Sequence, residues 1–392
     1  MNNPQSIFSI VTPSYNQLDW LRLCVASVRD QIAAADGGIR YAKCQPSEAR
    51  PNAGGSSQDG RAHLRNVQRR LFKGAWASCP HSFGLHISEM RPGGPASQMG
   101  NDNPKSKIPP LAVEHIIQDA GTPGIEEFAR EIGADFYKEG ELVFRSQVSD
   151  VSISRYRIAV YCESDSGMYD AVNKGYARAS GEFMAYLNCD EQYLPGTLEQ
   201  VREWFNVHRD KQVLFGDAIV VNPDGSYLCS RKVSRPRRFY TLVSRNLSIF
   251  TAATFIRKEV YDLGIRFDTR YKAVGDAVWA LELLDRKATL GLFGSPLAVF
   301  TDTGENMNIR PHARREKDEM FRSAPVWARR CRLLFIFAHR LNRFLLGAYS
   351  RSGVAYSIFT MQSPEERRDF QVARQTQTWR HGLATDPTKI PA

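Results

Sequence analysis

The chain has 392 residues, of which 42% are hydrophobic and 24% charged, and this balance predicts a globular α/β protein built as one large domain with appendages. Its formal net charge of +10 favours polyanionic partners, among which charge alone does not choose: nucleotides, lipid phosphates, an anionic membrane face or nucleic acid. The seven cysteines are odd in number and show no CxxC spacing, which favours a reducing compartment over a disulfide framework.

Membrane and export signals are weak. The N-terminal residues MNNPQSIFSIVTP lack the charged start and long apolar run of a signal peptide. The longest uncharged apolar run near the C-terminus, Leu333 to Ala338, is far shorter than the roughly 20 residues that a spanning helix needs. We therefore expect a cytoplasmic protein that does not cross a bilayer.

Strands and helices alternate along the chain. Residues 8–12 form a β-branched run closed by Pro13, and apolar residues at helical spacing follow in residues 18–31. The same order recurs at 113–119 with 125–133, at 157–163 with 168–179, and at 182–188 with 196–209. This alternation predicts a largely parallel sheet with right-handed crossovers.

Residues 32–110 interrupt the alternation, because they separate the first two strands by far more than the roughly 30 residues of a βαβ unit. They are rich in Gly, Pro, Ser and Asn, so we expect a mostly irregular, low-complexity insertion with one helix at residues 61–76. The spacing of Cys79, His81 and His86 matches no closed four-ligand zinc site.

The sheet is expected to end near Thr301, after a hairpin over residues 213–233, further helices and a last strand region at 290–301. Residues 303–392 are predicted to form a basic helical region. Within it, residues 325–349 carry one apolar stripe flanked by arginines. The stripe contains Trp327, Cys331, Leu334, Ala338, Leu341 and Leu345. Such a helix either lies on an anionic membrane surface or docks its stripe on the sheet, and the sequence favours neither.

Carboxylates gather at the expected strand ends, where ligands bind in open parallel sheets. Turn chemistry explains Pro, Gly, Ser and Asn at such places, but it does not explain so many acids at one edge. Like charges repel unless a cation and a polar ligand share the site. The acids are Asp119, Glu163, Asp165, Asp170, Asp190 and Glu191.

Four segments resemble, in order and register, the family 2 glycosyltransferases of the GT-A fold. They are IVTPSYNQLDWLRLCVASVRDQ, EHIIQDAGTPG, ESDSGMYDAVNKGYARASGEFMAYLNCDE and VGDAVWALELL, which fall within residues 7–31 and 112–302. The resemblance implies an α/β fold in which a GT-A (Rossmann-like), mostly parallel sheet is flanked by helices, with a C-terminal helical appendage. The catalytic domain would span residues 1–302, interrupted by the 32–110 insertion, and the C-terminal region residues 303–392.

The resemblance also implies a donor site. Pro13, Tyr15 and Asn16 would line the base pocket, with Tyr15 near the nucleobase. Asp119 would accept a hydrogen bond from a base ring N–H, commonly of uracil or thymine. The nucleotide-sugar site would be shaped by Asp165, Gly167, Asp170, Asn173, Lys174 and Asn188, and Gly167 and Gly175 would permit close backbone approach.

Two further roles follow from the resemblance. Asn188, Cys189 and Asp190 fall on a DxD-like motif, so Asp190, with Glu191 beside it, would bind Mg²⁺ or Mn²⁺ against the donor diphosphate. Asp276 would be the general base of an inverting transfer. As an acid at a helix N-terminus it also has a purely structural explanation.

Two positions depart from the family pattern. Cys189 and Glu191 stand where the family usually has Ser and a second Asp, which suggests weak activity or an unusual metal preference. The loop NLSIFTAATFIRKEV lacks the frequent His-Gln pair, so the acceptor is not specified. The basic run at residues 231–238 either holds an acceptor phosphate, such as that of a polyprenyl diphosphate, or is a solvated loop.

The sequence thus predicts a metal-dependent, inverting, hexosyltransferase-like enzyme. It would move a sugar from a UDP- or dTDP-type donor to a saccharide or lipid-linked acceptor in polysaccharide or cell-envelope glycan biosynthesis. It would work in the cytoplasm, peripherally at the inner membrane face through residues 325–349. The alternative is a catalytically impaired nucleotide-sugar-binding protein of the same fold. No recognition motif supports nucleic-acid binding, so no nucleic-acid partner is expected.

Overall fold

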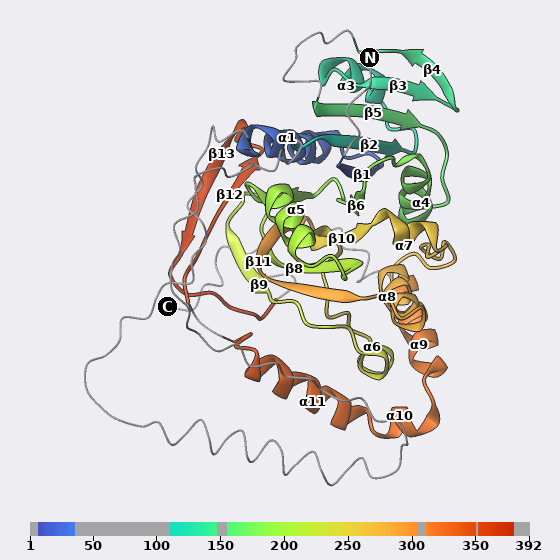
Figure 1. Ribbon diagram of the computed structural model, residues 1–392, viewed down its shortest axis with the longest axis vertical. Helices are drawn as coiled ribbons and strands as arrows, with labels where there is room; N and C mark the ends of the chain where they lie inside the picture. Colours follow the sequence, from blue (N-terminus) through green and yellow to red (C-terminus); the bar gives the residue numbers. More distant parts are fainter. Residues whose placement is uncertain (1–6, 36–109, 147–154, 305–310, 350–351, 380–392) are drawn as a thin grey trace, which may run out of the picture. The chain divides into compact units, whose positions relative to one another are not determined.

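The computed structural model describes residues 7–35, 110–146, 155–304, 311–349 and 352–379 (Figure 1). Its helices are α1 (Leu18–Ala35), α3 (Ile125–Glu131), α4 (Met168–Arg178), α5 (Thr197–Val207), α6 (Arg238–Ser244), α7 (Lys258–Asp262), α8 (Gly275–Asp285), α9 (Pro311–Ser323), α10 (Val326–Arg330) and α11 (Arg332–Leu345). Its strands are β1 (Phe8–Ser14), β2 (Val113–Asp119), β3 (Asp135–Lys138), β4 (Glu141–Phe144), β5 (Tyr156–Cys162), β6 (Phe183–Tyr186), β7 (Glu191–Tyr193), β8 (Val213–Val221), β9 (Tyr227–Arg231), β10 (Thr254–Arg257), β11 (Leu290–Thr301), β12 (Val354–Thr360) and β13 (Ser363–Val372).

One sheet of 11 strands carries the fold, in the order β4-β3-β5-β2-β1-β6-β10-β8-β11-β7, with β9 beside β8. The strands from β3 through β5, β2 and β1 to β6 pair in parallel, as do β8 and β11. β10 runs antiparallel between β6 and β8. The expected α/β fold, a large and mostly parallel sheet flanked by helices, is confirmed.

Alternation along β1 shows how the two faces of the sheet are covered. Phe8 and Ile10 pack with the buried faces of α1, α3 and α5, whereas Val11 packs with α4, α7 and α8. Successive side chains of a strand point to opposite faces, so this strand is buried on both sides, as its unbroken apolar run predicts.

The expected insertion begins later than predicted, because α1 continues to Ala35. Its eighteen residues keep an apolar face against the sheet beyond Gln31, which is itself buried. The rest of the insertion, including the helix expected at 61–76 and the residues Cys79, His81 and His86, lies outside the described residues.

The C-terminal region is not wholly helical, so this part of the expectation is wrong. After α9, α10 and α11 the chain forms the hairpin β12–β13 (red in Figure 1). Val354, Tyr356 and Ile358 alternate along β12 and pack on β8 and β11. Arg367 of β13 forms a buried ion pair with Asp30 of α1 at 2.7 Å. The hairpin is therefore attached to the 11-stranded sheet and to α1.

The predicted amphipathic helix divides at Cys331 into α10 and α11. Leu334, Leu341 and Leu345 of the predicted stripe are exposed, so docking of the stripe on the sheet is not observed. Instead α11 contacts α6, where the His339 ring stacks on Tyr240 at a centroid distance of 3.7 Å. Among the described helices, none has the length and apolar character to cross a bilayer.

Candidate functional site

The loops that follow β1, β2 and β5 meet at one edge of the sheet. The register pairs Ser14 with Asp119 and Asp119 with Cys162, so the three strands end level. Parallel strands that end level direct their following loops into the same space. β6 pairs with the other side of β1 and ends four residues before Asp190. This edge therefore holds the residues expected to bind nucleotide and metal.

Asp119 is fully buried and holds the loop after its own strand. Its Oδ1 accepts hydrogen bonds from the backbone N–H groups of Gly121 (2.8 Å) and Thr122 (2.7 Å), and its Oδ2 accepts from the Thr122 hydroxyl (2.6 Å). The Thr122 hydroxyl in turn accepts from the backbone N–H of Asn16 at 2.9 Å. Both oxygens of Asp119 are thus engaged, and a base N–H would have to use a remaining lone pair.

The loop after β1 presents Tyr15 to solvent. The Asn16 backbone is left-handed (φ 54°), a conformation that Asn tolerates better than most residues. The carbonyl of Pro13 accepts a hydrogen bond from the Cys189 thiol at 3.2 Å, which ties this loop to the DxD-like segment. Tyr15 itself is 63% exposed and is available for stacking.

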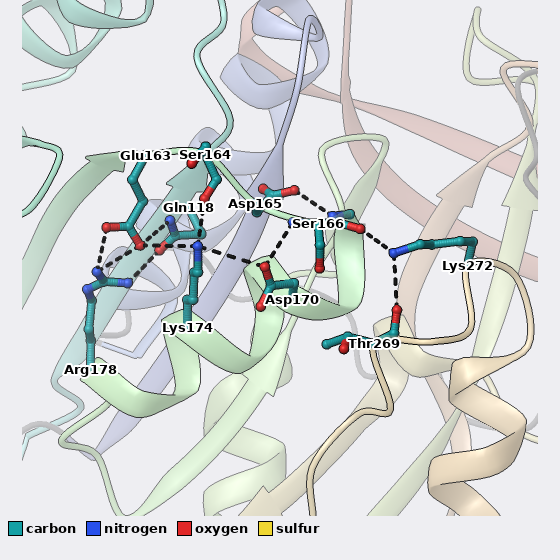
Figure 2. A network of polar contacts seen from close by, with 11 residues as sticks. Gln118, Glu163, Ser164, Asp165, Ser166, Asp170, Lys174, Arg178, Thr269 and Lys272 are labelled. Carbon is teal, nitrogen blue, oxygen red and sulfur yellow. Dashed lines mark hydrogen bonds and ion pairs between the residues drawn. The ribbon is translucent and has the colours of Figure 1, made fainter.

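Asp165 and Asp170 shape the loop at the start of α4 (Figure 2). The backbone N–H of Gly167 donates to Asp165 Oδ1 at 2.7 Å, and that of Ser166 donates to Asp170 Oδ2 at 2.9 Å. Gly167 has φ +122°, which a residue with a side chain rarely adopts. These two acids therefore have backbone partners, and the loop needs no cation to hold them.

Lys174 points back along α4 toward the same loop (Figure 2). Its Nζ donates to the Ser164 carbonyl at 2.6 Å and lies 3.8 Å from Asp170 Oδ2 and 4.0 Å from Glu163 Oε1. Arg178 binds both oxygens of Glu163, at 2.9 and 3.0 Å. Protein groups thus satisfy four of the six strand-end acids, Asp119, Glu163, Asp165 and Asp170, so these four need no cation at the edge.

Asn173 and Gly175 of α4 contact other parts of the fold rather than the edge. The Asn173 amide donates to the Phe267 carbonyl (2.7 Å) and accepts from its N–H (3.0 Å), which fixes the chain that leads to α8. A Cβ on Gly175 would lie 2.3 Å from Val11 Cγ1. Gly175 therefore allows α4 to pack on β1, and the expectation that it admits the nucleotide is wrong.

Asp190 and Glu191 are the two strand-end acids whose pKa is raised. Glu191 is 2% exposed, and its Oε2 accepts from the backbone N–H of Asn188 at 2.7 Å. Burial raises the pKa of Glu191, and the charge of Asp190 raises it further. Burial also raises the pKa of Asp190. The ionised forms of both are therefore costly without a cation.

Asp302 is a further carboxylate of this site that the sequence analysis missed. It directly follows β11, just as the other acids of this edge follow the strands that precede them. The backbone N–H of Thr301 donates to the Asp190 carbonyl at 3.0 Å, and the charge of Asp302 contributes to the raised pKa of Asp190. Trp379 Nε1 donates to Asp302 Oδ2 at 2.8 Å.

Two acids that repel each other fit Mg²⁺ or Mn²⁺, which take oxygen ligands and keep water and phosphate in the remaining positions. Asp190 and Asp302 meet this condition, whereas one oxygen of Glu191 is taken by the Asn188 N–H. In the described ranges, no three His, Cys, Asp or Glu side chains are grouped as a metal site.

Asp276 lies in the first turn of α8, partly exposed. Its backbone N–H donates to the Tyr169 hydroxyl at 3.2 Å, and its Oδ1 accepts from the N–H of Ala277 at 2.8 Å. Burial raises the pKa of Asp276 to about 6, although the nearby Lys317 of α9 opposes the shift. Such a carboxylate is suited to take a proton near neutral pH.

Glu316 of α9, which carried no motif signal, organises the start of α8. It is buried, and it accepts backbone N–H hydrogen bonds from Lys272 (2.9 Å), Ala273 (2.9 Å) and Val274 (3.1 Å). These are donors at the positive end of a helix dipole, where a carboxylate is stabilising. The C-terminal region therefore contributes directly to the position of Asp276.

Comparisons with known proteins point to one family. Residues 145–261 match the family model described as Glycosyl transferase family 2. The chain is 26% identical over 121 residues to the PGL/p-HBAD biosynthesis glycosyltransferases of Mycobacterium bovis and Mycobacterium tuberculosis. This match covers 31% of the chain and 44% of those relatives. Among solved structures, TarS of S. aureus in complex with UDP-GlcNAc aligns with a TM-score of 0.43 and 14% identity, covering 87% of this chain and 75% of that chain.

Proposed function

Because residues 145–261 match the model of glycosyltransferase family 2, we propose that the chain is an enzyme of this family. It would transfer a sugar from a UDP- or dTDP-type nucleotide donor to a saccharide or lipid-linked acceptor, with inversion. The observation that carries this proposal is the meeting of Asp190 and the loops after β1, β2 and β5 at one sheet edge. The charges of Asp190 and Asp276 both raise the pKa of Glu191, so this buried acid lies within electrostatic reach of each.

The donor would lie along the loops of this edge. Tyr15 would stack on the base, while Pro13, Asn16 and Asp119 would shape its pocket. The loop built by Asp165, Gly167 and Asp170, with Lys174, Asn173 and Asn188 in support, would receive the sugar and diphosphate. A divalent cation bound at Asp190 would neutralise the charge that grows on the leaving diphosphate. Glu191 would fix the Asn188 backbone, and so the position of Asp190, rather than act as a full ligand.

Asp276 would act as the general base. Its carboxylate accepts the proton of the acceptor hydroxyl as that oxygen bonds to the anomeric carbon, and the bond from that carbon to the diphosphate breaks on the opposite face. Attack opposite the leaving group inverts the anomeric configuration. Tyr169 and Glu316 hold the start of α8 so that the carboxylate keeps its place.

The acceptor and its location form a further part of the proposal. The mycobacterial relatives are named for PGL/p-HBAD biosynthesis, which supports a cell-envelope glycan as product. The exposed apolar face of α10 and α11, with its arginines, supports peripheral attachment at the cytoplasmic face of the membrane through residues 325–349.

A panel of nucleotide sugars, screened for donor hydrolysis with Mn²⁺ or Mg²⁺, tests the proposal without an acceptor. Wild-type protein should hydrolyse at least one donor slowly, and Asp190→Asn should lose both the hydrolysis and the metal-dependent part of UDP binding. Asp210→Asn, an exposed acid next to Lys211 and remote from the edge, is the matched control and should retain both.

A second candidate function is a nucleotide-sugar-binding protein without turnover, which the burial of Glu191 and the Cys189 substitution favour. Calorimetry with UDP and Mn²⁺ separates the two. Tight UDP binding with no hydrolysis or transfer for any donor would support the binding protein and contradict the enzyme.

A further inference from the structure

A small basic pocket lies between β9, the loop before β10 and α11. Its lining includes Arg231, Lys232, Ser248, Phe250 and Arg343. None of these residues belongs to the donor edge described above. Three of the eight lining residues are cations. They come from segments more than a hundred residues apart, so only the folded chain forms the pocket.

The cations of the pocket lack acidic partners. Within the described ranges no ion pair involves Arg231, Lys232 or Arg343. Burial and the charge of Arg343 lower the pKa of Arg231. The carboxylate of Asp217 is near enough for Lys232 and Arg343 to influence its pKa, but it accepts its hydrogen bond from the backbone N–H of Val233. One acid against three cations leaves the pocket suited to an anion.

Two of the lining residues carry side-chain donors without a partner among the described residues. Ser248 is 9% exposed, and neither its hydroxyl nor the Nε of Arg343 has a hydrogen-bond partner among the described residues. Buried polar groups are normally satisfied, so both donors could bind an anion in this pocket. The pocket has a free volume of about 10 Å³, roughly that needed by one water molecule, so a phosphate enters only if lining side chains such as Arg343 move. A single 3.2 Å hydrogen bond to Gln377 and a contact with the Tyr349 ring restrain this side chain.

The pocket adjoins the donor edge. The Phe250 ring contacts the Trp379 ring at a centroid distance of 6.3 Å, and the Trp379 indole donates to Asp302, the neighbour of Asp190. An anion in the pocket would therefore be separated from Asp302, and so from the donor edge, by the rings of Phe250 and Trp379.

α11 has two faces with different chemistry. Its inner side places Arg343 in the pocket and Asn342 on Arg237. Its outer side presents Leu333, Phe337 and Phe344, which are 79%, 64% and 67% exposed. Residues 320–364 contain no Asp or Glu and have seven arginines, at positions 322, 329, 330, 332, 340, 343 and 351. A lipid with an anionic phosphate matches both faces.

We propose that this pocket binds the phosphate or diphosphate group of a lipid-linked acceptor, with Arg231 and Arg343 as its principal ligands and the lipid chain over the outer face of α11. This proposal names the acceptor group of the proposed transfer reaction, so its role in catalysis rests on the proposed function. The guanidinium groups would bind phosphate oxygens through paired N–H donors.

Vesicle retention with the full chain tests the proposal without turnover. Phosphatidylcholine vesicles carry either phosphatidic acid, which has a terminal phosphate, or phosphatidylglycerol, which does not. The double variant Arg231→Gln/Arg343→Gln should bind phosphatidic acid vesicles about tenfold or more weakly, as expected for lost charge-assisted hydrogen bonds. Its binding to phosphatidylglycerol should fall far less. Arg340→Gln, an exposed arginine on the same helix, is the matched control and should not discriminate between the two lipids.

Equal loss of phosphatidic acid binding in Arg340→Gln, or none in the double variant, would overturn the proposal in favour of a diffuse surface charge. If glucose 1-phosphate releases the protein from the vesicles, the pocket binds phosphate groups in general. That result would support a phosphate site but contradict a lipid as its natural ligand. The same variants should retain donor hydrolysis. If wild type hydrolyses no donor, yet phosphatidic acid binding still depends on Arg231 and Arg343, the proposed transfer fails while the pocket stands.

Discussion

The backbone N–H of Val274 donates to the carboxylate of Glu316 at 3.1 Å, so a helix from the C-terminal region caps the helix that carries Asp276. The same carboxylate also accepts from Lys272 and Ala273. Asp276 lies two residues after Val274 in the chain. Its position therefore depends on α9 as well as on the sheet.

Replacement of Glu316 by Gln should lower kcat about tenfold or more, because the amide offers one acceptor oxygen and turns N–H donors toward backbone N–H groups. The KM for the donor should change little, since the donor loops lie elsewhere. Steady-state kinetics measures both quantities. Glu319→Gln, an exposed acid on the same helix, should behave as wild type. A parallel fall in donor affinity would show that Glu316 acts only through general stability.

Asp276 should set the acid limb of the pH profile. Its pKa of about 6 means that kcat/KM rises with pH through that value, because the base works in its ionised form. Asp276→Asn should abolish transfer and leave UDP binding intact. A profile that is flat between pH 5 and about 7 would contradict the assignment.

The same residue should also limit stability. A carboxyl whose pKa is raised on folding stabilises the protein below its unfolded value, near 3.8, and that contribution is lost as the pH rises through about 6. At pH 8, Asp276→Asn should therefore increase the free energy of unfolding, by on the order of 1 kcal/mol. Denaturant unfolding at pH 8 and at pH 4 measures the difference, which should shrink at the lower pH.

Gly175→Ala should destabilise the fold by about 1–3 kcal/mol, because the new methyl group would overlap Val11 where α4 crosses β1. Gly294→Ala is the control and should cost little, because no atom lies within 4 Å of the place that its methyl group would take. Thermal unfolding compares the two. If both variants lose the same stability, α4 can move away from the sheet to accommodate the new methyl group, and the predicted overlap with Val11 is wrong.

Phe337→Ser/Phe344→Ser should weaken retention on phosphatidylglycerol vesicles at least tenfold, because both rings are exposed and membrane binding scales with buried apolar area. Donor hydrolysis in solution should not change. Exposed Val207→Ser on α5 is the matched control, since this residue lies outside α10 and α11. Unchanged retention of the double variant would mean that the apolar face has another partner.

Sequence alone predicted the alternation of β1, β2, β5 and β6 with α1, α3, α4 and α5, because the period of the apolar residues in a segment distinguishes a strand from a helix. It did not predict the hairpin β12–β13. It also predicted that Tyr15, Asp119, Asp165 and Asp190 follow strand ends, since parallel strands deliver their loops to one edge. It left undecided whether the stripe of residues 325–349 faces a membrane or the sheet.

The backbone partners of Asp119, Asp165 and Asp170 lie within four residues of them, which is the local pattern of Asx turns and helix starts. Only the tertiary structure decided the distant contacts, such as that of Gly175 with Val11, which has no local sequence signal. The hairpin β12–β13, the cap by Glu316 and the pocket of Arg231 and Arg343 join segments far apart in the chain. Periodicity reports burial within a segment, whereas a hydrogen bond or a basic pocket depends on which distant segment packs against it.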